Sequence, residues 1–436
     1  MKTKALQSLL ALTLSLISAA SIVHGQTYDF SAATAQLQDN LSLYGNRVIA
    51  IIEQGDRGEI FRFQAGAIGA NTKTGIASCT KWFSGAIVLI CAERGYIRLD
   101  DCIGQYLPIF DTYGKGDITI RQCFAMKSGL QLDGPEYETD RTLTLAQSVD
   151  LIAQNTPVAF PPGTQLSYEG DGMQVVGRIC EIATGKSWGV LARELLFDPL
   201  GMTTADYLYF DPNPAIAGGA RCSPEDCLKF LRMIMRNGLS VTGTPVMSSR
   251  SVQEFFTNQT LGLPEYYSPW PPSFYYPYFQ RPDYGMGSWI LAQNPTNGVV
   301  EEVTSPGAFG TFPWVDRKRG LCGIIFMYQI TGGGFSATGP NNLHVLAQVR
   351  AEIDAKGLPP LPPPRNFSTS PNRSATAMSR SSRWRCLDTH APRSRVARHE
   401  PHAEALKFEP RAVGPSVLLR AGGRTHPGYF DVSACG

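Results

Sequence analysis

Residues 78–110 of this chain read SCTKWFSGAIVLICAERGYIRLDDCIGQYLPIF. The apolar run from Trp82 to Glu93, with a glycine two residues later, predicts a buried helix that stops there. Ser78 and Lys81 are three residues apart at its start, so their side chains share one face of the helix. A lysine in an apolar site loses its proton readily, and the neutral amine can take a proton from a serine hydroxyl. The stretch therefore predicts a serine nucleophile with a lysine base, although four residues alone are a weak motif.

The histidine content supports lysine over histidine as the base. Between the N-terminal apolar segment and the C-terminal tail there is one histidine, His344. It falls on a predicted helix near the end of the domain, where a structural role is expected. A Ser-His-Asp triad needs histidine as its base. The sequence therefore argues against that triad.

Segments with strand character occur near both ends of the chain, and helical segments lie between them. Two early strands, Arg47–Glu53 and Glu59–Ala65, are predicted to form a hairpin. Later strands are predicted at Tyr284–Leu291, Gly310–Val315 and Leu321–Tyr328, and other helices at Ala32–Leu43, Gln174–Ala183, Pro224–Met235 and Asn341–Ile353. The pattern predicts an α/β fold of the α+β type. One antiparallel sheet would be flanked by N- and C-terminal helices and interrupted by a large helical insertion, about residues 82–240.

The C-terminal part of the chain differs from the body in composition. The net charge of the 436-residue chain is +2. Residues 1–364 carry 27 basic and 32 acidic side chains, whereas the tail, residues 365–436, carries 12 basic and 5 acidic side chains. The tail has few aliphatic residues and is expected to be disordered. It is either a basic arm that binds polyanions or sequence from a wrong exon or reading frame. We expect no nucleic-acid binding by the folded domain. The predicted organisation is a signal peptide at 1–25, one hydrolase domain at 26–357 and the Pro- then Arg-rich tail at 358–436.

The N-terminus has the pattern of a secretory signal. Lys2 and Lys4 precede an apolar run that ends at Val23, and Gly25 is a small residue before the expected cleavage. The alternative is a membrane anchor, but the run contains Ser and Thr, and no other segment reaches spanning length. We expect a secreted, extracellular protein with no membrane span after signal removal.

Ten cysteines in an exported chain are compatible with disulfide bonds, whose connectivity the sequence does not give. Cys222 and Cys227 bracket a short turn and could pair, whereas Cys180 is expected to be a buried thiol. No cysteine or histidine cluster suits zinc, and we expect neither a metal nor another cofactor. Secretion would expose four sequons to glycosylation, at Asn40, Asn258, Asn366 and Asn372.

The region around Ser78 also has a family resemblance. Residues 78–110 resemble the nucleophile helix of the class C β-lactamase and serine-esterase superfamily, which includes penicillin-binding carboxypeptidases. Similar blocks follow in the family's order at residues 118–122, 128–130, 160–168, 177–181, 197–202, 284–287 and 305–316. The resemblance covers about residues 30–355 and implies a β-lactamase/transpeptidase-like fold.

The resemblance implies roles for individual residues. Ser78 would be the acylated nucleophile, Lys81 its base, and Tyr168 the tyrosine that assists proton transfer. Ser305 and Gly307 would lie on the strand edge beside the nucleophile. The backbone N–H groups of Ser78 and Ala308 would form the oxyanion hole.

Three positions depart from the family pattern. Gly170 stands where the family has an asparagine that holds a substrate amide, and Ser305 stands where it has histidine or lysine. Met126 and Lys127 replace a histidine–threonine pair. The acyl-transfer residues are therefore present without the groups that recognise β-lactams. An aromatic-rich segment, Tyr266–Phe279, is either a packed loop or an aromatic rim over the site.

These features predict a secreted serine hydrolase that forms an acyl-enzyme. Its substrate would be a small-molecule ester or amide with a neutral or apolar acyl group, so that it resembles an esterase more than a β-lactamase. The alternative is a catalytically weak or inactive binding protein of the same fold, because the asparagine and the cation are missing.

Overall fold

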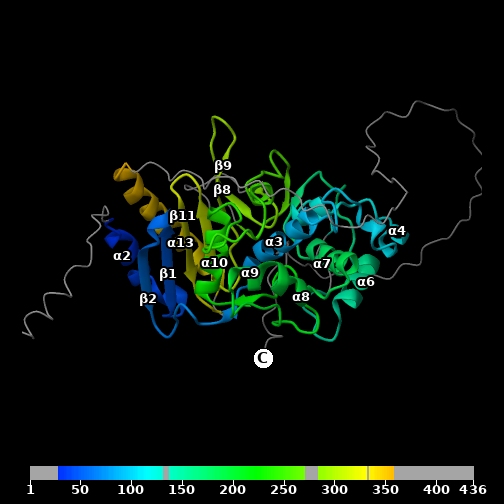
Figure 1. Cartoon of the computed structure of the whole chain (residues 1–436), viewed down its shortest axis with the longest axis horizontal. Coiled ribbons are helices and arrows are strands. Elements are labelled where there is room, and N and C mark those ends of the chain that lie inside the picture. Colours follow the sequence, from blue (N-terminus) through cyan, green and yellow to red (C-terminus); the bar gives the residue numbers. More distant parts are fainter. Residues whose placement is uncertain (1–27, 131–136, 271–282, 331–332, 358–436) are drawn as a thin grey trace, which may run out of the picture.

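A seven-stranded antiparallel sheet forms one side of the molecule in the computed structural model, which describes residues 28–130, 137–270, 283–330 and 333–357 (Figure 1). The strands, from one edge to the other, are β2 (Glu59–Ala65), β1 (Val48–Gln54), β11 (Leu321–Phe326), β10 (Phe312–Asp316), β9 (Val300–Thr304), β8 (Trp289–Gln293) and β7 (Asp283–Tyr284). β1 is buried along its whole length because five of its seven residues are aliphatic. It pairs with β11, which joins the two ends of the domain. The predicted fold class is confirmed.

The late strands differ from the prediction in two places. The single strand expected at 284–291 is two strands, β7 and β8, because the chain reverses where the Gly285 N–H donates to the Ser288 carbonyl. Gly287 in this turn has φ 84°, a conformation that favours glycine. β9 was not predicted, since its adjacent Glu301 and Glu302 interrupt the apolar alternation.

Two helices from the ends of the domain pack together beside the sheet, as predicted (Figure 1). They are α2 (Ser31–Asp39), followed by a 3₁₀ turn at Leu41–Tyr44, and α13 (Gly334–Ala355). α13 begins seven residues before the predicted Asn341 and contains Pro340. The prediction stopped there because proline removes a helical hydrogen bond. Proline is tolerated here in the second turn of a long helix.

The helices between β2 and β7 form the other side of the molecule. The α-helices are α3 (Thr80–Glu93), α4 (Ile109–Thr112), α5 (Ile120–Phe124), α6 (Leu145–Asn155), α7 (Asp171–Thr184), α8 (Trp188–Ala192), α9 (Asp198–Leu200), α10 (Pro224–Met235) and α11 (Ser249–Phe255). 3₁₀ turns occur at Gly55–Arg57, Ala77–Cys79 and Ile103–Gln105, and a π-helical turn at Arg193–Phe197. Two short strand pairs accompany them: β3 (Thr74–Gly75) with β5 (Arg221–Cys222), and β4 (Leu166–Ser167) with β6 (Glu265–Tyr267). α10 packs on β10 and β11, although the predicted insertion includes it.

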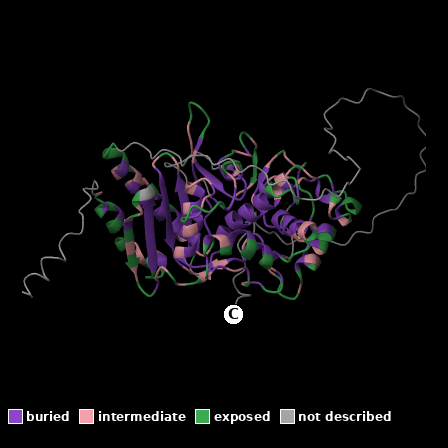
Figure 2. Ribbon diagram, viewed as in Figure 1, coloured by how far each residue is buried: buried purple, intermediate pink, exposed green. Residues whose placement is uncertain are grey.

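Helix α3 is buried on all sides, as its sequence predicted (Figure 2). Trp82 and Phe83 make edge-to-face contacts with Phe230 of α10, with ring centroids 5.6 and 4.8 Å apart. Gly85 lets the turn between β7 and β8 approach closely, because a Cβ there would lie 2.7 Å from the Met286 carbonyl oxygen. The start of α3 is therefore fixed in the centre of the molecule.

Seven cysteines of the described region are buried free thiols. Cys222 and Cys227 are both free thiols, so their predicted pairing is wrong. Each is almost fully buried and packs as a small apolar side chain. Cys180 is a buried free thiol, as predicted. Among the described residues, no helix has the length and apolarity needed to cross a membrane.

Several sequence predictions fall outside the described residues. These are the signal peptide, most of the aromatic-rich segment, the tail, and the sequons at Asn366 and Asn372. Glycosylation at Asn40 and Asn258 stays a prediction. The Asn258 amide nitrogen donates hydrogen bonds to Asp283 and Gln293, at 2.7 and 3.0 Å.

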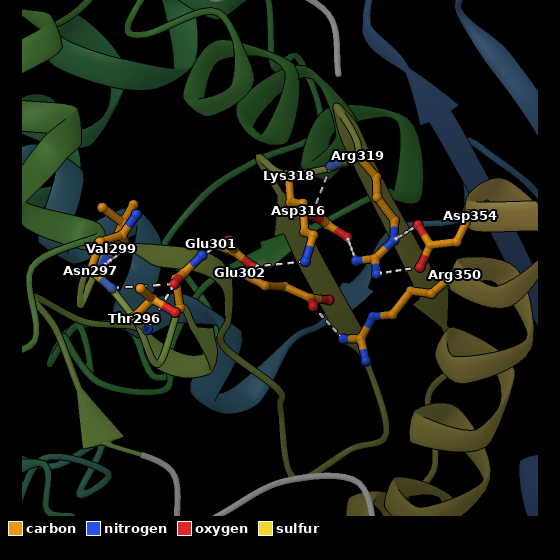
Figure 3. A network of polar contacts seen from close by, with 11 residues as sticks. Thr296, Asn297, Val299, Glu301, Glu302, Asp316, Lys318, Arg319, Arg350 and Asp354 are labelled. Atoms are coloured by element: carbon orange, nitrogen blue, oxygen red, sulfur yellow. Dashed lines mark hydrogen bonds and ion pairs between the residues drawn. The ribbon is translucent and has the colours of Figure 1, made fainter. Parts of the chain in front are cut away.

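An ion-pair network attaches α13 to the sheet (Figure 3). Arg350 of α13 pairs with the buried Glu302 of β9. Arg319 donates to both carboxylate oxygens of Asp354, at 2.8 and 2.7 Å, and to the buried Asp316 at 2.8 Å. Burial raises the pKa of Glu302 to about 7, and the charge of Arg350 opposes this rise. Arg350 therefore stabilises the ionised carboxylate.

We expect Arg350→Met to lower the free energy of unfolding by about 3 kcal/mol at pH 8, because an ionised Glu302 would lose its partner. The loss should be smaller at pH 5, where the carboxyl group is protonated and needs no counter-charge. Urea unfolding at both pH values measures the difference. Lys356→Met, which removes an exposed pair with Glu352, should cost less than about 0.5 kcal/mol. An equal loss at pH 5 and pH 8 for Arg350→Met would contradict the argument.

Candidate active site

The predicted nucleophile lies in a strained turn. Ser78 is the middle residue of the 3₁₀ turn Ala77–Cys79, which leads directly into α3. Ala77 has φ 45°, in the left-handed region that alanine rarely adopts. Ser78 itself is 6% exposed. Such strain persists only where the surroundings fix it, and it often marks functional positions.

Lys81 is buried beside Ser78 on the first turn of α3. Its Nζ donates to Ser78 Oγ at 3.2 Å and to the Ala217 carbonyl at 3.1 Å. Burial lowers the pKa of Lys81 to about 8, although the charges of Glu138 and Glu169 oppose this. A substantial fraction of Lys81 is thus a neutral amine slightly above neutral pH. The structure brings together the two residues that the sequence paired.

Tyr168 covers the other side of the lysine. The Lys81 Nζ lies 4.6 Å from the centroid of its ring, and Trp289 stacks against the ring at 5.0 Å. Its backbone N–H donates to the Tyr267 carbonyl at 3.0 Å, just after β4. Burial raises the pKa of Tyr168, and a hydrogen bond with the Ser78 side chain partly opposes this. Tyr168 is therefore a neutral phenol near pH 7, so Lys81 is the better base.

The segment after β9 approaches the nucleophile turn closely. Ser305 Oγ donates to the carbonyl oxygen of Ser78 at 3.2 Å, so this side chain holds the nucleophile's backbone. A Cβ at Gly307 would lie 2.1 Å from the Ile76 carbonyl oxygen, so only glycine allows this approach. Ala308 follows and is exposed. Among the described residues, no acceptor takes the Ala308 N–H. The position next to Ser78 therefore has a free backbone donor.

The residues that depart from the family pattern have other partners. Lys127 Nζ donates to the Gln259 carbonyl at 2.9 Å. Met126 has φ 57°, and its sulfur accepts the Glu169 N–H at 3.4 Å. Gly170 is buried, without a side chain that could bind substrate. Position 170 therefore supplies no amide, and the cation of Lys127 is bound to a backbone carbonyl.

An aromatic cluster stands beside Ala308. Phe309 contacts Tyr328 and Tyr209, with ring centroids 5.3 and 6.0 Å apart, and the two tyrosine hydroxyls are 3.2 Å apart. All three side chains are partly exposed. Sequence reasoning pointed to residues 266–279 for such a surface, and missed this one because it combines three separate segments.

The sequence also missed a group of buried carboxyl side chains near Lys81: Glu138, Glu169 and Asp171. Glu169 follows Tyr168 directly and accepts from Ser128 Oγ at 3.1 Å and the Gly172 N–H at 2.7 Å. Burial raises the pKa of Glu169 to about 7. Within the described ranges, no three His, Cys, Asp or Glu side chains are arranged to hold a metal ion.

Comparisons with known proteins identify the family and the fold. A family model described as Beta-lactamase matches residues 49–347. A structure from Bacteroides dorei DSM 17855, described as a candidate beta-lactamase, has a TM-score of 0.68 and 27% identity, and the match covers 75% of this chain and 100% of that one. EstCE1, described as a hydrolase with promiscuous acyltransferase activity, shares the fold, with a TM-score of 0.57, 15% identity and coverage of 73% and 97%.

One curated relative is Penicillin-binding protein 4 of Amycolatopsis lactamdurans. It is 28% identical over 205 residues, which are 40% of this chain and 54% of the relative. The chain thus spans about half the length of this relative.

We expect Gly307→Ala to slow labelling of Ser78 by a fluorophosphonate about a hundredfold, because the added Cβ would push the 305–308 segment away from the nucleophile turn. Intact-protein mass spectrometry against time gives the rate. Gly189→Ala in α8 makes the same chemical change where the Cβ would meet nothing within 4 Å, and it should leave the rate unchanged. Equal rates in both variants would show that the close approach is not needed.

Proposed function

The chain belongs to the beta-lactamase family of serine hydrolases, and on this basis we propose that it hydrolyses esters or amides through an acyl-enzyme on Ser78. The observation that carries the proposal is the 3.2 Å contact between Lys81 Nζ and Ser78 Oγ, made by a lysine that is 3% exposed. A serine nucleophile needs a base within hydrogen-bond reach, and a buried lysine serves when its proton is weakly held.

In the proposed acylation step, neutral Lys81 takes the proton of Ser78 as Oγ attacks the substrate carbonyl. The new C–O bond gives a tetrahedral intermediate, whose negative oxygen would accept hydrogen bonds from the N–H groups of Ser78 and Ala308. Collapse of the intermediate breaks the bond to the leaving group. Lys81 returns the proton to that group, with Tyr168 as a hydrogen-bonding relay between them. Water then attacks the ester of Ser78 by the same route and releases the acid.

The substrate we propose has a neutral or apolar acyl group. Ser305 binds the backbone of Ser78, and position 170 carries no side chain, so neither supplies the cation or amide expected of a β-lactam site. The aromatic cluster of Tyr209, Phe309 and Tyr328 offers apolar surface beside Ala308. These features favour esterase-like activity over β-lactam hydrolysis.

Ser78→Ala should abolish hydrolysis of p-nitrophenyl esters and fluorophosphonate labelling, and Lys81→Met should lower kcat/KM by about a thousandfold or more. In the wild type, kcat/KM should rise with pH around a midpoint near pH 8, because only deprotonated Lys81 is a base. Comparison of kcat/KM for the acetate, butyrate and octanoate esters and for a chromogenic cephalosporin measures the preference for the acyl group. Lys186→Met, at an exposed pair with Glu194, is the matched control and should keep full activity.

The outcome decides between an enzyme and a binding protein of the same fold. A folded wild type that is unlabelled at Ser78 and turns over none of these substrates would overturn the proposal. Turnover that persists in Ser78→Ala would assign the activity to a contaminant or to another residue.

We also propose export of the protein through residues 1–25, which the sequence supports with two lysines before an apolar run. Expression of the full chain in a secreting eukaryotic host should release a protein that begins at Gln26, as read by N-terminal sequencing. Deletion of residues 2–25 should keep it inside the cell. Full-length protein that stays in the membrane fraction would contradict the proposal and favour an anchor.

A further inference from the structure

Glu138 is a buried acid that the proposed mechanism leaves unused. It lies in the segment before α6 and is 5% exposed. Its Oε2 is fully buried and has no hydrogen-bond donor among the described residues. A buried carboxyl oxygen without a donor is costly, so its retention calls for a reason.

The side chain of Glu138 fills the space that glycine leaves at position 170. A Cβ on Gly170 would lie 2.4 Å from Glu138 Oε1, so no side chain fits there while the carboxyl group keeps its place. Position 170 is where the family resemblance expects asparagine. The position of the Glu138 carboxyl group therefore depends on the absence of a side chain at Gly170.

Backbone contacts hold Glu138 in this place. The side-chain nitrogen of Asn213 donates to the carbonyl oxygens of Tyr137 and Asp140, at 2.7 and 3.2 Å, on either side of Glu138. Gln174 of α7 donates to Asn213 Oδ1 at 2.9 Å and accepts the Ile216 N–H at 2.9 Å. The segments 137–140 and 213–217 are thereby fixed to each other.

The same 213–217 segment holds Lys81. The Ala217 carbonyl accepts from Lys81 Nζ at 3.1 Å, and the Ala217 side chain lies 3.3 Å from the Cβ position of Gly170. Glu138 thus packs against Gly170, Lys81 bonds to Ala217, and positions 170 and 217 lie next to each other. Glu138 exerts the strongest opposing charge on Lys81, ahead of Glu169.

Asp171, the first residue of α7, is a second buried acid whose negative charge acts on Glu138. Asp171 Oδ1 has no donor among the described residues, and Asp171 Oδ2 accepts from Thr156 Oγ1 at 2.7 Å. Burial raises the pKa of Glu138 to about 8 and that of Asp171 to about 6, and the charge of Asp171 adds to the rise at Glu138. Near neutral pH Glu138 is therefore the more protonated of the two acids.

We propose that Glu138 is a positioning residue whose carboxyl group, seated against Gly170, sets the protonation of Lys81. This inference rests on the proposed roles of Ser78 and Lys81. When Glu138 gives up its proton, its negative charge favours the ammonium form of Lys81 and opposes base catalysis. When it keeps the proton, Lys81 is free to lose its own. The polar and titratable groups that surround this pair are Ser78, Cys79, Tyr168, Glu169, Asp171, Thr156 and Lys115.

Two variants should shift the pH dependence in opposite directions. Glu138→Gln removes the charge and keeps the volume, so the midpoint of the pH–rate curve should fall by about one pH unit. Asp171→Asn removes a negative charge that raises the pKa of Glu138 and so favours the ionised form of Glu138, and the midpoint should rise. Asp140→Asn removes an exposed charge from the same segment and should leave the midpoint in place. The rate is that of Ser78 labelling by a fluorophosphonate between pH 5.5 and 9.5.

If the role of Glu138 were purely structural, its substitution would change the rate of Ser78 labelling or the melting temperature without moving the midpoint of the pH–rate curve. An unchanged midpoint in folded Glu138→Gln overturns the inference, and so does a shift of equal size in Asp140→Asn. Should Glu138→Gln fail to fold, the upward shift in Asp171→Asn decides the question.

A readout without catalysis separates this inference from the proposed function. The ¹³Cε chemical shift of Lys81 in lysine-labelled protein, assigned by its loss in Lys81→Arg, follows the protonation of the amine directly. It should titrate at lower pH in Glu138→Gln than in the wild type. A wild type that is never labelled at Ser78 would refute the hydrolase proposal, while this titration would still test the Glu138–Lys81 coupling.

Discussion

The contact between buried Lys81 and Ser78 is the constraint on which the rest of the structure depends. An amine keeps a low proton affinity only where water is excluded, so α3 must be enclosed on every side. α7, α8, α10 and α11 supply that enclosure, and Tyr168 with Trp289 covers the amine itself. The strained Ala77 and the glycine at 307 then bring the 305–308 segment against the turn that carries the serine. The packing around α3 and the low proton affinity of the Lys81 amine thus depend on each other.

Sequence reasoning worked where the determinants are local. The hairpin of β1 and β2, the buried α3 and the amphipathic α10 follow from apolar periodicity and from their stop and start residues, and they occur nearly at the predicted bounds. The Ser78–Lys81 pair follows from helical spacing alone. The resemblance then brought in Tyr168 and the 305–308 segment, which are distant in sequence and which no local pattern could place beside Ser78.

What could not be predicted depends on contacts between distant segments. β9 contains two adjacent glutamates, and one of them is buried only because Arg350 of α13 neutralises it. The carbonyl of Ala217 and the carboxyl group of Glu138 reach the site through the 213–217 segment, which carries no motif. The spacing of Cys222 and Cys227 suggested a disulfide bond, but both are buried free thiols. Their packing in the core could not be read from that spacing.

The order of strands in the sheet has a consequence for how the protein is made. β1 leaves the ribosome early, but its central partner β11 and the helix α13 are synthesised more than 260 residues later. Until β11 is made, the sheet lacks the strand that links β1 to β10. Pairing between such distant strands is slow to form. The Ser78–Lys81 pair therefore belongs to an incomplete domain until the last strand has been synthesised.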